Sequence, residues 1–338
     1  MSQMTGTQSI RFDREIYINS YASVVGQKEG EGPLGAQFDQ VEEDPLYGCN
    51  TWEEAESRFQ TEAARRAVAK AGLSMEEIRL IYAGDLLAQC SASTFGISSL
   101  ERPLYGLFGA CSTMGEALSM ASMAVAGGYA DPVLALTSSH FGSAEKEFRF
   151  PLDYGSQRPL SASWTVTGSG ACVVGTKKGK VRIAGLTTGK IVDYGLKDSQ
   201  NMGACMAPAA CDTISRNLAD FGWQPGAYDR IVTGDLGFVG QQILFDLLEQ
   251  EGWDIRGQHM DCGMMIFDPA SQDTHAGGSG CGCSASVLAA ELLPRLAAGE
   301  WKRLLFVPTG ALMSKVSFYE GQSVPGIAHG VILEHVEG

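Results

Sequence analysis

The fold is decided by the stretch FGACSTMGEAL, which runs from Phe108 to Leu118. The residues just before it, 104–108, are apolar and predict a strand, and small, helix-tolerant residues continue from it to Ala126. Cys111 is therefore expected at a strand-to-helix turn, with its sulfur near the free amides of a helix N-terminus. That position favours a thiolate or a bound anion and presents a cysteine as a nucleophile. The alternative is a buried cysteine that only fills space as a small apolar side chain.

The pattern around Cys111 occurs twice in the chain. A strand ending in Gly-Asp is predicted at 80–86 and again at 230–236, and in each half a glycine-rich turn with a cysteine then opens a helix. The second such cysteine is Cys283. Glycines end both helices, and a buried apolar strand follows each of them. The matched order and spacing predict an internal duplication, with chance resemblance between α/β units as the alternative.

The helix after Cys111 carries small residues on nearly every face. Such a helix has no polar side to offer water and must lie between sheets. The apolar strands indicate sheets that are covered on both faces. We therefore expect an α/β chain with five layers in the order αβαβα, built from an N-terminal half at 1–178 and a C-terminal half at 179–338.

Further segments complete the expected organisation. Residues 326–333 predict one closing strand, and residues 26–44, which are rich in glycine and acids, predict a surface loop. Residues 141–163 hold several charged side chains between two strands and predict a loop over a site. Asp85 and Asp235, which end the two duplicated strands, are expected only to form turns.

The composition excludes several classes of protein. The formal net charge is −14, which repels phosphate backbones and anionic lipid surfaces, so nucleic acid is not an expected partner. The polar first residues and the short, interrupted apolar run at 114–126 predict neither a signal sequence nor a transmembrane segment. The nine cysteines indicate reduced thiols rather than a disulfide framework. Cys281 and Cys283 lack the second pair that a zinc site needs, so no metal site is expected.

The duplicated pattern resembles the thiolase-like superfamily over nearly the whole chain. In that superfamily the cysteine at the position of Cys111 is acylated by a thioester, and histidine and asparagine from the second half complete the site. This sequence departs from the superfamily there, because it has 234–237 (GDLG) and 278–284 (GSGCGCS) where condensing enzymes carry those residues. An acidic Asp235 beside a thiol would raise the pKa of the thiol rather than activate it. We therefore expect no catalytic residue.

A narrower resemblance rests on four segments, 109–114 (GACSTM), 164–171 (WTVTGSGA), 261–263 (DCG) and 325–329 (PGIAH). Together they resemble the stage V sporulation protein AD family, whose members are catalytically silent. That resemblance implies binding of dipicolinic acid (pyridine-2,6-dicarboxylate) or its calcium chelate, with no cofactor. It also implies work with membrane-embedded stage V sporulation A proteins that carry this molecule into the developing spore and release it in germination. The implied location is peripheral, on the cytoplasmic face of the forespore or spore inner membrane.

A site for a flat aromatic dianion needs donors for two carboxylates and an apolar slot for the ring. The helix N-terminus at Cys111 offers free amides for one carboxylate, and Arg149 with its neighbour Lys146 could supply charge. His140 and His329 are expected to donate toward the ring. Asp261 fits if it meets calcium, shares a proton with the ligand or orients a donor. The expected ligand-binding residues are Cys111 and Asp261 first, followed by His329, His140 and Arg149.

Two other functions remain open from the sequence. One is an acyltransferase or condensing enzyme that uses Cys111 with an unusual base such as His329. The other is an assembly protein whose old pocket is vestigial. The superfamily resemblance also implies a homodimer, since its members are commonly dimers.

Overall fold

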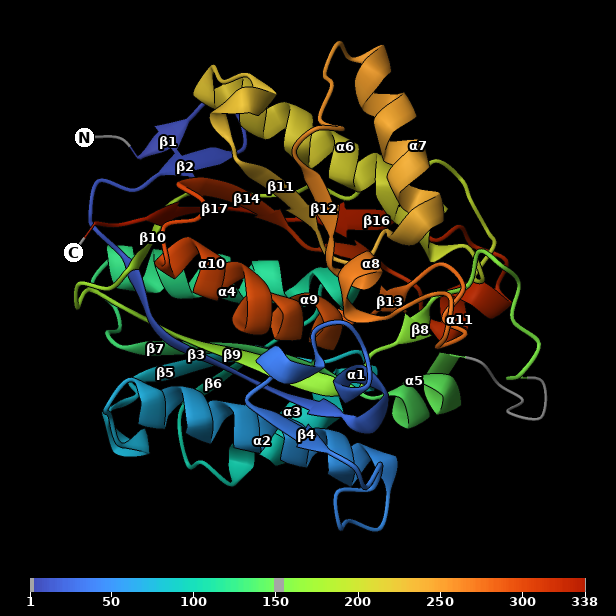
Figure 1. The fold of residues 1–338 in the computed structure, drawn as a ribbon, viewed down its shortest axis with the longest axis horizontal. Helices are drawn as coiled ribbons and strands as arrows, with labels where there is room; N and C mark the ends of the chain where they lie inside the picture. Colours follow the sequence, from blue (N-terminus) through green and yellow to red (C-terminus); the bar gives the residue numbers. More distant parts are fainter. Residues whose placement is uncertain (1–2, 149–154, 338) are drawn as a thin grey trace.

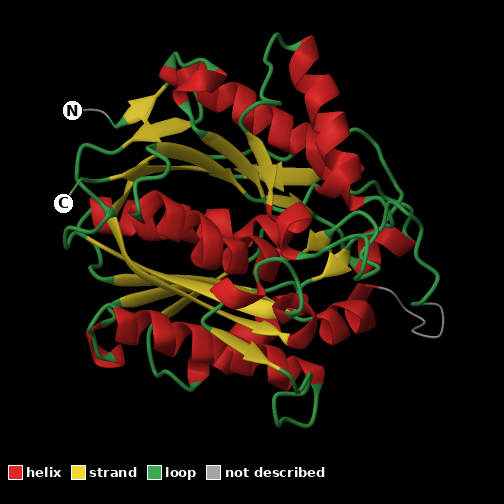
Figure 2. Cartoon of the chain, in the orientation of Figure 1, coloured by secondary structure: helices red, strands yellow, loops and turns green. Residues whose placement is uncertain are grey.

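The computed structural model describes residues 3–148 and 155–337 and arranges them in five layers (Figure 1). Two half-sheets lie on either side of a central layer of helices, and a further layer of helices covers the outer face of each (Figure 2). The predicted αβαβα order is therefore confirmed. Among the described residues, no helix is both long and apolar enough to cross a membrane.

The two half-sheets repeat one strand order. The first runs β6 (Leu104–Leu107), β5 (Leu80–Gly84), β7 (Val133–Ser139), β9 (Gly168–Gly175) and β3 (Tyr17–Gly26). The second runs β12 (His259–Asp261), β11 (Arg230–Thr233), β14 (Arg303–Val307), β17 (Gly330–His335) and β10 (Val181–Thr187). In both, the first three strands are parallel and the last two pairings are antiparallel. Equal order and equal strand direction confirm the predicted duplication.

The surface residues of each helix determine the layer in which it lies. The outer layers hold α2 (Trp52–Lys70) and α3 (Ser91–Ser98) on the first half-sheet, and α6 (Met202–Phe221) and α7 (Gly237–Gln250) on the second. The central layer holds α4 (Thr113–Ala126), α9 (Cys281–Val287) and α10 (Leu293–Ala297). Small residues let α4 lie between the sheets, where Met114, Ala117 and Ala121 are fully buried.

The second central helix begins at Cys281, two residues before the predicted Cys283. It also contains a π-helical turn at Leu288–Leu292. Pro294 explains that turn, because a proline has no amide hydrogen to donate and its ring crowds the carbonyl one turn earlier.

The predicted closing strand at 326–333 is wrong in one respect, because it splits at His329. Its first part, β16 (Gly326–Ala328), pairs with β15 (Thr309–Ala311) in a separate small sheet. Its second part, β17, stays in the large sheet beside β14. Pro308 separates β14 from β15 opposite this break and offers no amide hydrogen to continue the ladder. Both strands therefore leave the large sheet at the same level.

Two segments expected to be loops contain regular structure. Residues 26–44 include α1 (Gln27–Gly30) and β4 (Gln40–Glu42), which pairs with the end of β3. Residues 141–163 begin with the helix α5 (Phe141–Phe148). The strand β8 (Trp164–Thr165) follows and pairs with β13 (Gly278–Ser279), and α8 (Cys262–Ile266) lies just after β12.

The start of the chain belongs to the second half-sheet. β2 (Ser9–Arg11) pairs with β10 and with β1 (Met4–Thr5). The carboxylate of Asp220 on α6 accepts hydrogen bonds from the amides of Thr7 and Gln8. β3, which comes next in the chain, lies in the first half-sheet and pairs with β10 only through its first residues. β3 therefore lies in the opposite half-sheet from β1 and β2, the strands that precede it in the chain.

Candidate functional site

Two cavities flank α5 at the end of the molecule where the strands β8 and β13 lie. The larger has a volume of about 760 Å³ and is lined by the segment after β3, the start of α5 and β8. The smaller has a volume of about 60 Å³ and lies beside Cys111. Glu145 of α5 lines both cavities, so this helix forms the wall between them.

Cys111 lies where the sequence predicts it, between a strand and a helix. It sits in a 3₁₀ turn, Ala110–Ser112, that joins β6 to α4. The turn places Ala110 at φ +50° and is closed by a hydrogen bond of 3.0 Å from the amide of Gly109 to the hydroxyl of Thr113. The side chain is half-buried and lines the smaller cavity. The predicted strand-to-helix presentation is confirmed.

Two expectations for the thiol of Cys111 oppose each other, a thiolate favoured by the helix start and a pKa raised by Asp235, and the structure supports the second. Burial raises the pKa of the thiol well above its ordinary value, and the nearby carboxylate of Asp235, to which the thiol donates a hydrogen bond, raises it further. Asp235 is itself 2% exposed and accepts hydrogen bonds from the amide of Gly280 and the hydroxyl of Thr309. Burial raises the pKa of Asp235 to about 7. The pair therefore keeps a neutral thiol rather than a nucleophile.

Asp235 was expected to form a turn and, if it lay beside a thiol, to raise the pKa of that thiol, and the structure shows the second effect at Cys111. What sequence reasoning did not predict is how the contact arises, because Asp235 reaches across from the second half to the cysteine of the first. The signal that could have found it is the duplication itself. Because the halves face one another across the central helices, a strand end of one half meets a helix start of the other.

Asp261 lies at the end of β12 and is fully occupied by the fold. Its carboxylate accepts a hydrogen bond of 2.6 Å from the hydroxyl of Thr233 and caps α8 through the amide of Met264. It also accepts bonds from the amides of Leu236 and Gly237, in the turn that opens α7. Burial raises its pKa, and its charge in turn raises the pKa of Asp235. Asp261 is not among the residues that line either cavity.

His329 is also placed away from both cavities. It is 8% exposed, and its Nδ1 accepts a hydrogen bond of 3.2 Å from the amide of Gly189. Burial lowers its pKa to about 4, so the ring is neutral near pH 7. The groups that hydrogen bond to Cys111 are Asp235, Ser279 and Gly280, and His329 is not one of them. His329, the base named in the acyltransferase alternative, is therefore not hydrogen-bonded to the thiol, and the acidic group that is bonded to it is Asp235.

Of the last two predicted residues, one lines the larger cavity and the other lies outside the part of the chain that the structure describes. His140 lines the larger cavity, where its Nε2 donates to the carbonyl of Pro45 and its Nδ1 accepts from the amide of Gly142. Arg149 lies outside the described residues. Its neighbour Lys146 forms an ion pair of 2.7 Å with Glu53. The predicted residues are therefore not brought together at one place.

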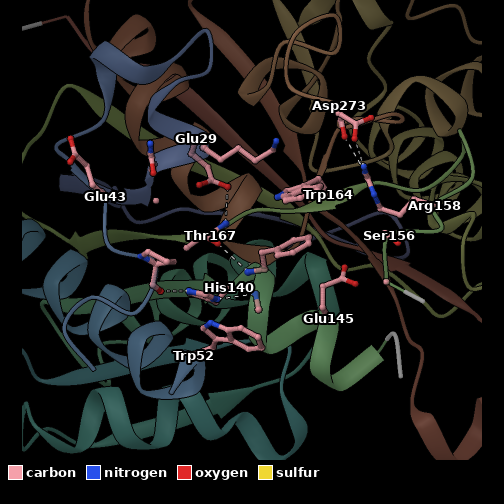
Figure 3. Close-up of a pocket in the computed structure, with 17 residues that line it drawn as sticks. Glu29, Glu43, Trp52, His140, Glu145, Ser156, Arg158, Trp164, Thr167 and Asp273 are labelled. Carbon is pink, nitrogen blue, oxygen red and sulfur yellow. Dashed lines mark hydrogen bonds and ion pairs between the residues drawn. The ribbon is translucent and has the colours of Figure 1, made fainter. Parts of the chain in front are cut away.

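The larger cavity is built around Trp164, which sequence reasoning noted only as part of a family segment. The ring of Phe141 stacks on it with centroids 3.9 Å apart and an angle of 8° between the planes. The Lys28 ammonium lies 4.4 Å from the Trp164 centroid, and the Arg158 guanidinium lies 4.9 Å from it. Figure 3 shows Trp164 and Arg158 on one side of the cavity and Trp52 and His140 on the other.

Both cations are held in place by polar contacts, and the partner of Arg158, Asp273, itself lines the cavity. Lys28 donates to the carbonyl of Gln272 at 2.6 Å, and Arg158 pairs with the carboxylate of Asp273 at 2.7 Å. Trp52 lies flat against Gly142, where an added Cβ would be 2.3 Å from its ring. These partners come from segments far apart in the sequence, which is why no local pattern indicates the cavity.

The larger cavity also contains acidic groups. Glu29 is 1% exposed, accepts a hydrogen bond of 2.9 Å from the amide of Thr167 and lines the cavity. Burial raises the pKa of Glu29 to about 7. Glu43 and Glu145 line the cavity as well. Among residues 3–148 and 155–337, no group of three His, Cys, Asp or Glu side chains is placed to hold a metal ion.

Comparison with known sequences gives one family. The family model for stage V sporulation protein AD matches residues 6–334. The chain is 41% identical over 336 residues to stage V sporulation protein AD of Bacillus subtilis (strain 168), which covers 99% of each sequence.

Comparison with solved structures gives the same fold as the sequence resemblance. The 3-oxoacyl-[acyl-carrier-protein] synthase III of Aquifex aeolicus matches with a TM-score of 0.57 and 15% identity, over 95% of this chain and 100% of that one. Cerulenin-bound OleA of Xanthomonas campestris matches with a TM-score of 0.60 and 15% identity, over 96% and 97%. The tetronic acid condensing enzyme AbyA1 matches with a TM-score of 0.58 and 18% identity, over 94% and 99%. At such low identity these likenesses show a thiolase-like fold and no shared activity.

Proposed function

This chain belongs to the stage V sporulation protein AD family, and from that premise we propose that it binds dipicolinic acid, free or as its calcium chelate, without catalysing a reaction. The bound molecule would be carried into the developing spore and released in germination. Membrane-embedded stage V sporulation A proteins would be the partners in this transport, and the chain would lie peripherally on the cytoplasmic face of the forespore or spore inner membrane.

One observation carries the proposal, the stacked Phe141–Trp164 pair with Lys28 and Arg158 beside it. Dipicolinic acid is a flat ring with a carboxylate on either side of its nitrogen. Its ring matches an aromatic wall, and its two carboxylates match two cations held at the same wall. The cavity of about 760 Å³ is also within the usual range of small-molecule sites, about 300–1,000 Å³.

Volume argues against the cavity beside Cys111 in this conformation. Its 60 Å³ corresponds to about two water molecules, which is less than a substituted pyridine occupies. Cys111 therefore stays a proposed ligand residue only if α5 moves. We place the ligand in the larger cavity, with the neutral Cys111 and the bonded Asp235 on the far side of α5.

The acids of the larger cavity fit both forms of the ligand. A protonated Glu29 would not repel the free dianion, and its pKa of about 7 makes that form available near neutral pH. The chelate carries no net charge, and calcium accepts more oxygen ligands than dipicolinate supplies. Glu43, which lines the cavity, could supply one of them.

The absence of a nucleophile supports the non-catalytic part of the proposal. The pKa of the Cys111 thiol is raised by burial and by Asp235, and the two histidines expected near it are engaged elsewhere. A raised thiol pKa, with a buried carboxylate as the acidic group bonded to the thiol, disfavours the thiolate that acyl transfer needs in its first step.

Calorimetric titration with dipicolinic acid, with and without calcium, tests the proposal. Lys28→Gln and Trp164→Leu should each weaken binding by about tenfold or more, since a charge-assisted contact or a stacking wall is lost. The matched control is Lys146→Gln, a lysine on α5 that is paired to Glu53 and does not line the cavity.

Two results would contradict the placement or the function. If Cys111→Ala abolished binding and Lys28→Gln left it unchanged, the ligand would belong beside Cys111. If the unaltered protein gave no heat with either form, dipicolinic acid binding would be wrong, and labelling of Cys111 by acyl-CoA would be the next measurement.

A further inference from the structure

One end of the molecule exposes large apolar side chains on projecting segments. The helix α11 (Lys315–Tyr319) contains no buried residue, and it presents Val316 at 68% exposure and Tyr319 at 70%. The loop at 188–200 presents Ile191 at 62% and Tyr194 at 66%. In Figure 1 both segments lie at the right-hand end, beside β8 and α5. Isolated exposed apolar residues are ordinary, but a contiguous group of them marks an interaction surface.

Hydrogen bonds join these segments into one surface. Val192 and Gly326 exchange backbone bonds of 2.9 and 2.8 Å, and the amide of Val324 donates to the carbonyl of Leu196. Ser161, next to the exposed Leu160, donates to the carbonyl of Gln200 at the end of the same loop. We call this surface the apolar rim and define it by Leu160, Ile191, Tyr194, Val316, Phe318 and Tyr319.

The rim differs in charge from the rest of the chain. Its segments, 188–200 and 312–324, contain as many lysines as acids, namely Lys190, Lys197 and Lys315 against Asp193, Asp198 and Glu320. The whole chain carries −14. Lys315 and Lys190 also pair with the acids Glu147 and Asp212 of neighbouring segments. An acidic protein approaches an anionic surface most easily with a face that is less negative than the rest of the chain, and the rim is such a face.

The shape of the rim favours a bilayer over a protein partner. Its side chains project from a loop and from a short helix that buries none of its residues, rather than lining a groove. Projecting aliphatic side chains with tyrosines at the same level are suited to the boundary between headgroups and acyl chains. The rim also borders the smaller cavity, since Gln200 and Met313 of the adjoining segments line it.

We propose that the apolar rim inserts its side chains into the surface of a lipid bilayer and so orients the ligand cavities toward the membrane. This inference rests on the proposed function, which places the chain peripherally on a membrane. It adds a direct lipid contact and the residues that make it.

Vesicle flotation of the full chain tests the inference. The probe is vesicles of phosphatidylethanolamine and phosphatidylglycerol, in low and high salt. The unaltered chain should float with them in both, because the rim has no net charge and screening has little to weaken. Val316→Ser and Tyr194→Ser should each lower the partition coefficient by about tenfold, the effect of losing one buried apolar side chain.

Matched controls separate lipid contact from general surface polarity. Tyr129→Ser, after α4, and Tyr105→Ser, in β6, remove tyrosines that are 84% and 60% exposed away from the rim, and both variants should float like the unaltered chain. Titration with dipicolinic acid on every variant should be unchanged. If the unaltered chain bound dipicolinic acid normally but did not float with the vesicles, the lipid contact would be refuted and the proposed function would still stand.

Two further outcomes would also overturn it. If the rim variants and the tyrosine controls lost vesicle binding equally, the chain would contact lipid through no specific face. Retention by native membranes that disappears after protease treatment, with no flotation on pure lipid, would assign the rim to a protein partner instead.

Discussion

The two cavities beside α5 differ in what their walls already do. In the larger one, Lys28 and Arg158 lie against Trp164 beside a volume of about 760 Å³, although each cation also has a polar partner. Beside the smaller one, of about 60 Å³, the carboxylate of Asp235 holds Gly280, Thr309 and the thiol of Cys111. The first arrangement leaves room for a ligand, and the second is part of the fold. A residue at the expected catalytic position therefore says less about binding than the volume left beside it.

Asp261 offers the largest test of this difference. Asp261→Ala would leave the hydroxyl of Thr233 and the amides of Leu236, Gly237 and Met264 without an acceptor in a buried place. We expect the free energy of unfolding to fall by about 4 kcal/mol, measured by urea denaturation. The exposed Asp13→Ala should change it by less than about 0.5 kcal/mol. Unchanged stability with lost ligand affinity would instead make Asp261 a ligand residue.

Glu29 tests the larger cavity through pH. Its pKa is about 7 in the fold against 4.5 for an ordinary glutamate, so the native state holds a proton that the unfolded state releases. Stability from this group is full below pH 4.5 and is lost as the pH rises through 7. Glu29→Gln removes that loss. The gain in free energy of unfolding of the variant over the unaltered protein should therefore be about 3 kcal/mol larger at pH 8 than at pH 4. Exposed Glu31→Gln is the control, and a parallel pH profile for the Glu29 variant would refute the assignment.

Asp235 gives the smallest effect and sharpens the view of the smaller cavity. Asp235→Asn removes a charge that raises the pKa of the Cys111 thiol. Alkylation of Cys111 by iodoacetamide at pH 8, followed by mass spectrometry of its peptide, should accelerate by about tenfold. Asp85→Asn changes the equivalent aspartate of the first half, whose partners are Leu87 and Ser93, and should leave the rate unchanged. Equal rates in all three proteins would mean that burial alone controls the thiol.

The sequence predicts the layers because the signals for them are local. Small residues after Cys111 specify a helix between sheets, and the repeated strand ends specify two halves. Pro308 could have predicted the break at His329, but only with the knowledge that the two residues lie opposite each other. Such knowledge is a matter of strand register, which no single stretch of sequence contains.

The candidate site was predicted less well for the same reason. The turn at Cys111 is local and was found, whereas the partnership of Cys111 with Asp235 depends on how the halves face one another. Lys28 lies in a segment expected to be a surface loop, and it becomes a cavity residue only through Trp164. His329 and Asp261 have the residue types of a site, yet Nδ1 of His329 accepts from a backbone amide and the Asp261 carboxylate is bonded to Thr233 and to backbone amides.

The attachment of the first strand to the second half constrains how the chain emerges during synthesis. Apart from their pairing with β1, residues 7–12 find their hydrogen-bond partners at 184–188 and at Asp220. The ribosome must therefore release more than half of the chain before its beginning can be anchored, and contacts this distant in sequence form slowly. An N-terminal tag or truncation would act on the last step of assembly rather than the first.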